Sequence, residues 1–518
     1  MQSFLQRHAS EIKGVLSGFD RVRFRGTIRW LASLEGMKTY LGTTKRMLKD
    51  FNDWAKSRTE RIRVASERLA AAAGGEVIYL QSSRTSKEQV ALETACAKGC
   101  QEGLVAVLSC VEPCQSFRVG PDRASRRLEL RQQFMKCLHY YFYVQDRRLG
   151  LLHLRLQTWA PFTIQVCMNG REWLACEMTR KGIEFEQRDN CFVHVANVVR
   201  AQSLLDRQLQ TDWSGWLDCL TRKFHPAHAG LFDAGPLDYY WSADETEWAT
   251  DVMFRSRESL GRIYPRLLRH ALTTFDSKDV LRFLGQTPVI RRNSKAEITS
   301  SLATRPEGTR VKHARNRNSV KMYDKQETVL RIETTINDPR DLKVLRPKEG
   351  APNGPKQYRQ LRKGVADLHR RAEVSQKSNQ RYLEALASVD SSATLGETVR
   401  PVCQPTRWKG RQVRGLQPLG GPDGALLAAI SRGEFLLNGF RNRDLRELLF
   451  GSVDRKSPDA KRQAAKVTRW IRLLRAHGLI QKVPKTHRYQ LTPAGTVTIA
   501  AVNNAQLASI EALTQLAA

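Results

Sequence analysis

The sequence predicts a multidomain protein of the α+β or α/β class, with a mixed-sheet body, a long basic helix and a small basic domain at its C-terminus. Three observations lead to this fold class. Segments with the two-residue period of strands alternate with segments of helical period over residues 1–340. An arginine-rich helical stretch follows, and the last hundred residues combine a basic amphipathic helix with a short basic hairpin. The length of 518 residues suggests about two to four domains.

The first range, residues 1–125, has the pattern of an α/β domain. Residues 20–30 alternate as a strand does, and residues 39–73 have a helical period. Residues 76–114 then give a strand, a helix that ends at Gly99 and a second strand. This order predicts one β-α-β unit.

The middle of the chain divides into two further expected domains. Residues 126–290 begin with β-hairpins, one of them turning at the sequence DRRLG, and continue as helices. Residues 291–390 hold a second group of strands, from about 297 to 337, and then the long basic helix over 355–389. We therefore expect a body in which sheets and helices are mixed.

The balance of charge indicates a polyanionic partner. The chain has 85 lysines and arginines against 52 acidic residues, a net charge of +33. Such a field gives salt-dependent affinity for phosphate backbones. We expect DNA as the partner, with RNA as the alternative, and a small-molecule substrate is not implied. The sequence has no apolar run of membrane-spanning length and no signal peptide, so we expect a cytoplasmic protein without membrane contact.

A linker and a C-terminal domain are expected at the end of the chain. Residues 391–423 contain serine, glycine and four prolines without helical period, which is typical of a linker. The domain over 424–518 then begins with two short helices, the second with Asn438 as its cap. A third, longer helix precedes a hairpin that turns near Pro484.

This third helix and hairpin are strongly basic. Between Arg455 and Arg488 there are eleven lysines and arginines and one acidic residue, Asp459. One face of such a helix can pack while the other enters a DNA groove, as in a winged helix-turn-helix. The residues that we expect to bind nucleic acid are Lys461, Arg462, Lys466, Arg469, Arg472, Arg475, Lys482, Lys485 and Arg488.

The sequence RWIRLLRAHGLIQKVPKTHRYQLTPAG resembles the recognition helix and wing of bacterial winged-helix proteins. Their usual form is a basic helix, then HGLI, a basic hairpin and Y-x-LT-x-x-G. The resemblance covers about the last fifth of the chain and implies the fold. It implies no single task, because winged helices serve repressors, replication initiators, transposases and some protein contacts.

A predicted hairpin over residues 319–333 carries the sharpest catalytic candidate. If its two strands pair through a turn at Gln326 and Glu327, one face holds a tyrosine, three cations and a carboxylate. These residues are Lys321, Tyr323, Lys325, Arg331 and Glu333. The hydroxyl can attack phosphorus, the cations can stabilise its oxygens, and the carboxylate can bind a metal or accept the proton.

The segment HARNRNSVKMYDKQETVLRIET weakly resembles the Y-x-K … R-x-E segment of plasmid and filamentous-phage rolling-circle replication initiators. These proteins nick DNA through a tyrosine. The resemblance implies Tyr323 as nucleophile, Lys325 as phosphate clamp and Glu333 as metal or base carboxylate. The chain departs from many of these initiators because it lacks their His-hydrophobic-His motif; His153 and His194 are isolated.

A second candidate is an acidic cluster in the sequence ADETEWATDVMF. Four carboxylates lie within eight residues, and on a strand Glu245, Glu247 and Asp251 share one face. We expect these three to bind Mg²⁺ or Mn²⁺, which prefer oxygen ligands. Asp20 and Glu112 lie on or just beyond apolar strands, where nucleases of the RNase H type also place acids.

Other cofactors and contacts follow from the remaining residues. No organic cofactor is expected, and Cys96/Cys100 and Cys110/Cys114 fall at the ends of a helix and a strand, so a structural zinc site is not expected either. Phosphate contacts from the body are expected from residues of the long helix and the hairpin. They are Arg362, Arg370, Arg371, Lys321 and Arg331.

The sequence therefore predicts a nucleic-acid-binding protein of the mobile-element or replication-initiator type, with tyrosine-dependent DNA nicking. Two alternatives stay open. One is a regulator or structured-RNA-binding protein without enzymatic activity. The other is a metal-dependent nuclease or transposase that uses the carboxylate cluster.

Overall fold

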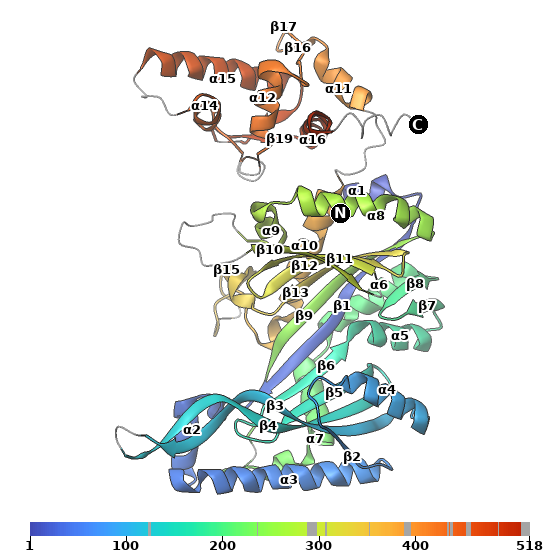
Figure 1. Cartoon of the computed structure of the whole chain (residues 1–518), viewed down its shortest axis with the longest axis vertical. Coiled ribbons are helices and arrows are strands. Elements are labelled where there is room, and N and C mark those ends of the chain that lie inside the picture. Colours follow the sequence, from blue (N-terminus) through green and yellow to red (C-terminus); the bar gives the residue numbers. More distant parts are fainter. Residues whose placement is uncertain are drawn as a thin grey trace.

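One eleven-stranded sheet forms the body of the protein (Figure 1). Helices lie on both sides of this sheet, and a separate group of helices lies beyond one end of it. The fold is therefore α+β with a large mixed sheet. The structure is a computed structural model that describes residues 1–122, 126–235, 237–286, 298–305, 308–351, 353–387, 395–432, 435, 439–451, 457–484 and 486–508.

The strands of the sheet are antiparallel neighbours except for β2 and β3, which are parallel. In spatial order they are β10 (Ile298–Arg305), β11 (Gly308–Arg315), β12 (Asn318–Lys325), β13 (Val329–Ile336), β9 (Tyr240–Phe254), β1 (Ile12–Thr27), β6 (Ile164–Asn169), β5 (Gly150–Gln157), β4 (Leu128–Asp146), β3 (Gly103–Pro121) and β2 (Val77–Leu80).

The two halves of the sheet share one strand order. From the centre outward, one half runs β1-β6-β5-β4-β3 and the other runs β9-β13-β12-β11-β10. In each half a long central strand is followed by helices and then by four successive antiparallel strands that return to it. The first half adds β2 and α4. The sequence shows no repeat, so this repetition is visible only in the topology.

Long helices cover one face of the sheet. Alternation along β1 directs Val22 and Phe24 to this face, into the main core cluster, and Arg21 and Arg23 to the other. The helices on the covered face are α1 (Gln2–Arg7), α2 (Leu34–Thr43), α3 (Phe51–Ala72), α7 (Trp213–Phe224), α8 (Arg257–Thr273), α9 (Ser277–Phe283) and α10 (Leu368–Leu386).

The opposite face is covered at two places by smaller clusters. The first cluster packs under α4 (Lys87–Lys98), and the second under α5 (Gly170–Arg180), α6 (Val198–Arg207) and the hairpin of β7 (Phe185–Arg188) and β8 (Cys191–Val195). Polar side chains of β1 and β9 lie between them, including the half-exposed Arg23. The short pair β14 (Lys343–Arg346) and β15 (Gln357–Gln360) precedes α10.

The C-terminal unit has a core of its own, in which Leu427, Phe440, Val467 and Leu474 are fully buried. Phe440 forms a bridge with Tyr489 beside the last hairpin. The elements are α11 (Leu395–Cys403), β16 (Thr406–Trp408), β17 (Arg411–Val413), α12 (Gly421–Ile430), α14 (Asn442–Phe450), α15 (Pro458–Ala476), β18 (Ile480–Lys482), β19 (Tyr489–Leu491) and α16 (Pro493–Leu507).

The hairpin predicted for residues 319–333 is confirmed in its turn and its register. Gln326 and Glu327 both have positive φ, 53° and 59°, as the two central residues of a type I′ turn do. Tyr323 lies opposite Arg331. The expected N-terminal strand and β-α-β unit are likewise present as β1 and β2-α4-β3, whereas the helix expected over 39–73 is divided between α2 and α3.

Several expectations for the fold need correction. Strands from the ranges 1–125, 126–290 and 291–390 join one sheet. The expected linker, 391–423, contains a helix and a hairpin because Val399 and Val402 pack into the C-terminal core. The long helix expected over 355–389 begins only at α10, after strand β15. Asn438, expected as a helix cap, lies outside the described residues.

The substitution Gly170→Ala should strongly destabilise the protein. A Cβ atom at Gly170, the first residue of α5, would lie 1.9 Å from the carbonyl oxygen of Phe19 in β1. Because the backbone of a central strand cannot shift without disturbing its neighbours, we expect a loss of about 3 kcal/mol in the free energy of unfolding. Urea titration followed by circular dichroism measures it.

Gly261→Ala is the matched control. Gly261 is exposed in α8, and an added Cβ would meet no atom within 4 Å. Alanine's higher helix propensity should stabilise this variant by about 1 kcal/mol. A Gly170→Ala protein as stable as Gly261→Ala would contradict the close packing of α5 on β1.

Candidate functional site

Three carboxylates from three strands converge on the face of the sheet opposite the long helices. They belong to Asp20 of β1, Glu247 of β9 and Glu333 of β13, and one oxygen from each lies within 4.8 Å of the others. Asp20 and Glu333 are buried, and Glu247 is partly accessible. Oxygen ligands at this spacing can hold a divalent metal ion. This carboxylate triad is the one cluster of its kind in the described part of the chain.

Strand register explains why these residues meet. Glu333 lies opposite Lys321 in β12, and Glu247 lies opposite Arg21 in β1. Asp20 precedes Arg21 at a register shift between β1 and β9, where the strand is irregular. Such an irregularity re-aims a side chain. The triad therefore depends on contacts between residues more than 80 positions apart.

Lys321 supplies the positive charge of the triad. Its Nζ donates to Glu333 Oε1 at 2.6 Å and to Glu247 Oε1 at 3.0 Å. Burial favours the neutral amine, but Glu333 and Glu247 outweigh it and raise the pKa of Lys321 above its ordinary value. The ammonium therefore lies between two of the three carboxylates that can hold a metal ion.

Glu333 titrates near neutrality. Burial raises the pKa of Glu333 to about 7, and the carboxylates of Glu247 and Asp20 act in the same direction, against Lys321. Burial also opposes ionisation of Glu247, yet Lys321 and Arg21 hold its pKa below the ordinary value. Near pH 7 the site can thus hold or release a proton at Glu333.

A buried network of arginines lies beside the triad. Arg331 Nε and Nη2 donate to the two carboxylate oxygens of Asp251 at 2.6 and 2.9 Å, and Arg331 Nη1 donates to Asp20 at 2.8 Å. Arg171 of α5 reaches Asp251 at 2.9 Å. Asp251 is fully buried, and these two guanidinium groups hold its pKa below the ordinary value against the effect of burial.

The expected metal ligands therefore need correction. Glu247 belongs to the triad, but Asp251 is taken up by Arg331 and Arg171, and Glu245 pairs with Arg23 at 3.1 Å. The other two ligands, Asp20 and Glu333, come from distant strands. The sequence feature that could have indicated these two ligands is an acidic residue within an otherwise apolar or alternating strand.

Tyr323 does not have the surroundings expected of a nucleophile. Its side chain lies on the same face as Glu333 but is only 7 % exposed. Burial, and then Glu333, raises the pKa of its hydroxyl. Lys325, the expected phosphate clamp, is buried and binds Asp189 of the β7–β8 turn at 3.0 Å. Burial and Glu333 thus both disfavour the phenolate of Tyr323, which is the form of tyrosine that attacks phosphorus.

The arginines expected to track phosphates along the body are used within the fold. Arg362 and Arg370 both donate to the carboxylate of the buried Asp367. Arg371 has no exposed surface, and burial lowers its pKa to about 10. Arg331 is likewise buried. Arg371 and Arg331 are thus not available to a nucleic acid, whereas Arg362 and Arg370 are partly exposed and already paired with Asp367.

The C-terminal unit presents the basic residues differently. Val467, Ile471 and Leu474 of α15 face its core. The exposed residues of the same helix include Lys461, Arg462, Lys466, Arg469 and Arg472. A helix with this division has one packed side and one cationic side.

Four further basic residues were expected to bind nucleic acid. Lys482 of β18 is exposed. Arg475 is half-buried with its guanidinium group over Trp408 at 5.2 Å, and Arg488 donates to the carbonyl oxygen of Gly439. Lys485 lies outside the described residues. Arg475 and Arg488 thus stabilise the unit itself.

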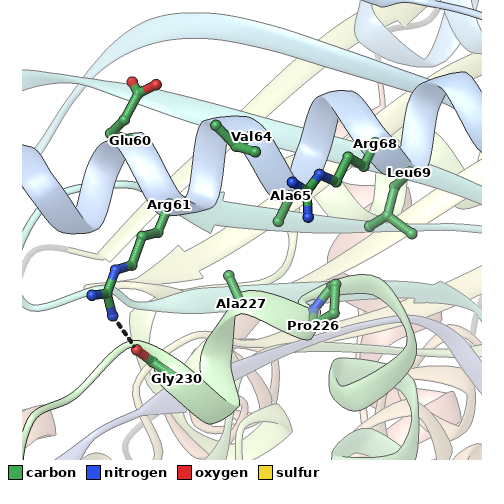
Figure 2. A pocket seen from close by; sticks show the side chains of 9 residues that line it. All are labelled: Glu60, Arg61, Val64, Ala65, Arg68, Leu69, Pro226, Ala227 and Gly230. Atoms are coloured by element: carbon green, nitrogen blue, oxygen red, sulfur yellow. Dashed lines mark hydrogen bonds between the residues drawn. The ribbon is translucent and has the colours of Figure 1, made fainter.

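A separate pocket lies between α3 and the 3₁₀ helix η4 (Pro226–Gly230), and α3 packs against β3 (Figure 2). Its volume is about 610 Å³. Arg61 and Arg68 lie over an apolar floor, and Arg61 donates to the carbonyl oxygen of Gly230 at 2.6 Å. The lining residues are Glu60, Arg61, Val64, Ala65, Arg68, Leu69, Pro226, Ala227 and Gly230.

Comparison with known proteins gives no match. No family model matches the chain, and neither a curated protein nor a solved structure matches it. None of the described helices combines the length and the apolarity that crossing a bilayer requires. Function must therefore be inferred from the carboxylate triad and the basic helix.

Glu333→Gln should remove a pH dependence of stability. The pKa of Glu333 is about 7 in the folded protein and about 4.5 when unfolded, so the folded state holds the extra proton between these values. Wild-type stability should fall by on the order of 3 kcal/mol from pH 4.5 to pH 7.5 through this group. Urea titration at both pH values should show that Glu333→Gln lacks this fall.

The exposed Glu35 of α2 provides the control, because glutamine at that position should leave the pH dependence of wild type unchanged. Identical pH profiles for Glu333→Gln and wild type would contradict the assignment of the titrating group.

Proposed function

We propose that the protein binds DNA through its C-terminal unit, which has the element order of a winged helix-turn-helix. Helices α12, α14 and α15 are followed by the hairpin β18–β19, and Phe440 adds a bridge to Tyr489 beside that hairpin. In this arrangement α15 enters the major groove and the hairpin lies against the backbone. The element order and the shared core support the proposal.

The observation that carries the proposal is the cationic side of α15. The exposed basic residues recur along the helix while Asp459, in its first turn, is the single acid. Phosphates would be neutralised by Lys461, Arg469 and Arg472, which are exposed and lie up to eleven positions apart on this helix. Phosphate contacts of this kind dominate affinity and release counterions.

The mixed-sheet body favours a role beyond regulation. We place the protein among DNA-binding proteins of mobile elements or replication initiation, because a DNA-binding unit is joined to a body that holds a carboxylate triad. A regulator without enzymatic activity needs no such triad. In such a regulator the buried Lys321–Glu333 pair would be a structural ion pair. A titration with Mn²⁺ distinguishes this alternative from a metal site.

A second candidate function is metal-dependent cleavage of phosphodiesters at the carboxylate triad. Asp20, Glu247 and Glu333 would hold Mg²⁺ or Mn²⁺, and the ion would supply a Lewis acid and an activated water. Lys321 would then be free to face a phosphate oxygen. Water is the nucleophile in this proposal, because burial and Glu333 raise the pKa of the Tyr323 hydroxyl and disfavour its ionised form.

Arg469→Ala should weaken DNA binding mainly through its salt dependence. Each lost phosphate contact should lower the slope of log K against log salt by about one. Fluorescence anisotropy with a labelled duplex measures this slope when binding is titrated at salt concentrations from about 50 to about 300 mM, over which affinity falls steeply. The effect should be the same for unrelated DNA sequences.

Arg400→Ala is the matched control, because Arg400 is exposed on α11, a helix that packs against α16. Its slope should equal that of wild type. Equal slopes for Arg469→Ala and Arg400→Ala would contradict the proposal that α15 contacts phosphates.

Lys321→Met should tighten metal binding. The ammonium contacts two of the three ligands and carries the same sign as the ion, so its removal should increase affinity for Mn²⁺ at least about tenfold. Isothermal titration calorimetry with Mn²⁺ measures the change. Lys312→Met is the control, because Lys312 lies opposite Lys321 in β11 and makes neither of these two bonds.

The double variant Glu247→Gln/Glu333→Gln should lose the binding. If neither wild type nor Lys321→Met binds Mn²⁺, a metal-dependent activity at this site is ruled out.

With supercoiled DNA and Mn²⁺, Tyr323→Phe should cut as wild type does and no covalent adduct should form.

A further inference from the structure

Two cysteines and a serine form a cluster on strands β3 and β4, apart from the carboxylate triad. Ser116 Oγ lies 3.2 Å from Cys114 Sγ and 3.1 Å from Cys137 Sγ. Ser116 has no exposed surface, Cys137 is buried, and Cys114 is partly accessible. One hydroxyl therefore joins an accessible sulfur to a buried one.

The polar groups around this cluster leave one sulfur able to carry a negative charge. Gln157 Nε2 donates to Ser116 Oγ at 3.1 Å, which orients the hydroxyl toward the sulfurs. His139 lies on the same face of β4, and its Nδ1 is 3.0 Å from the carbonyl oxygen of Cys137. A hydroxyl, a thiol and an imidazole are the neutral groups that can donate hydrogen bonds to a thiolate.

The neighbouring charged groups do not oppose this charge. Glu112, two residues before Cys114 on the same face, accepts from Tyr141 at 2.6 Å and pairs with Arg155 and Lys87 at 2.8 and 3.0 Å. Its carboxylate is thus balanced by two cations. The carboxylate nearest to Cys114 along its own strand is therefore already compensated.

The two thiols differ in acidity. Hydrogen bonding from Cys137, and then from His139 and Ser116, holds the pKa of Cys114 well below its ordinary value, against the effect of burial. The hydrogen bond to Cys114 keeps the proton on Cys137 and raises its pKa, and burial adds to this. The thiolate is the nucleophilic form of cysteine. The more accessible sulfur is therefore also the more reactive one.

We propose that Cys114 is an oxidant-reactive thiol that hydroperoxides convert to a sulfenic acid. The thiolate sulfur of Cys114 attacks one oxygen of the peroxide, an S–O bond forms, and the O–O bond breaks. With hydrogen peroxide the leaving group is hydroxide, which takes a proton from solvent to give water. The sulfur is oxidised by two electrons and the peroxide is reduced by two.

Strand register favours the sulfenic acid over an internal disulfide. Cys114 lies opposite Met135, and Cys137 lies opposite Glu112, so the two cysteines are diagonal neighbours. Diagonal Cα atoms are about 7 to 8 Å apart, whereas disulfides need less than about 7 Å. At this typical diagonal spacing, a disulfide would require the two strands to approach each other.

The other cysteines lack this combination. Burial raises the pKa of Cys110 and raises that of Cys191 to about 11. Cys219 and Cys403 are exposed, so a reagent can reach them. Cys403 thus serves as an internal reference that differs from Cys114 in its greater exposure.

Alkylation of the full-length protein at pH 6 tests the thiolate. An ordinary thiol is almost fully protonated at this pH. Iodoacetamide should therefore modify Cys114 at least about tenfold faster than Cys403, as followed by peptide mass mapping. Modification of Cys114 at or below the rate of Cys403 would overturn the proposal. Ser116→Ala and Cys137→Ser should both slow the reaction at Cys114.

Oxidation tests the product. After brief exposure to hydrogen peroxide, dimedone should label Cys114 in the wild-type protein, and Cys114→Ser should lose that label while the label elsewhere stays the same. A disulfide between Cys114 and Cys137 in the peptide map would overturn the sulfenic acid as the product. Circular dichroism shows whether each variant is folded, and Cys114→Ser, at a partly accessible position, keeps the test valid if Ser116→Ala unfolds.

Discussion

The arrangement of the sheet depends on a buried arginine that holds three strands together. Arg331 of β13 binds Asp251 of β9 through two parallel hydrogen bonds and Asp20 of β1 through a third. Arg171 adds α5 to this network, and the carbonyl oxygen of Asn190 adds the β7–β8 turn. Loss of one partner from such a network leaves a buried charge without compensation, which destabilises proteins by about 3 to 5 kcal/mol. The network also fixes Asp20 beside Glu247 and Glu333, so the candidate metal site depends on it.

The two halves of the sheet share a strand order but not a chemistry. In one half the paired strands β13 and β12 carry Glu333 opposite Lys321. The corresponding strands of the other half, β6 and β5, carry Cys167 opposite His153 on the same face, with Arg155 close by. A thiol, an imidazole and a guanidinium cannot replace carboxylates as ligands for a hard cation. Strands β6 and β5 therefore carry no counterpart of the Glu333–Lys321 pair, although β1 of the same half supplies Asp20 to the triad.

Local features of the fold could be predicted from the sequence, and features that depend on distant strands could not. The hairpin and its turn at Gln326 and Glu327 follow from a two-residue period and a short polar interruption. Glu333 was predicted to lie beside Lys321 because one hairpin contains both. Asp20 could not be assigned to the same site, since no pattern within a strand says which strands become neighbours. Arg371 was expected on a surface because composition says nothing about which side of a helix a sheet will cover.

The pairing of β1 with β9 sets an order for folding during synthesis. When β6 has been made, β1 has one partner, but the edge that β9 will occupy is still open. The end of β9 is about 85 residues further along the chain, which corresponds to roughly 4 to 17 s of translation at ordinary rates. During this interval a sixteen-residue strand presents free backbone groups, with Arg21, Arg23 and Arg25 along it. Their like charges discourage two nascent chains from joining at this edge, so the same arginines that later pair with acids on β9 protect the unfinished protein.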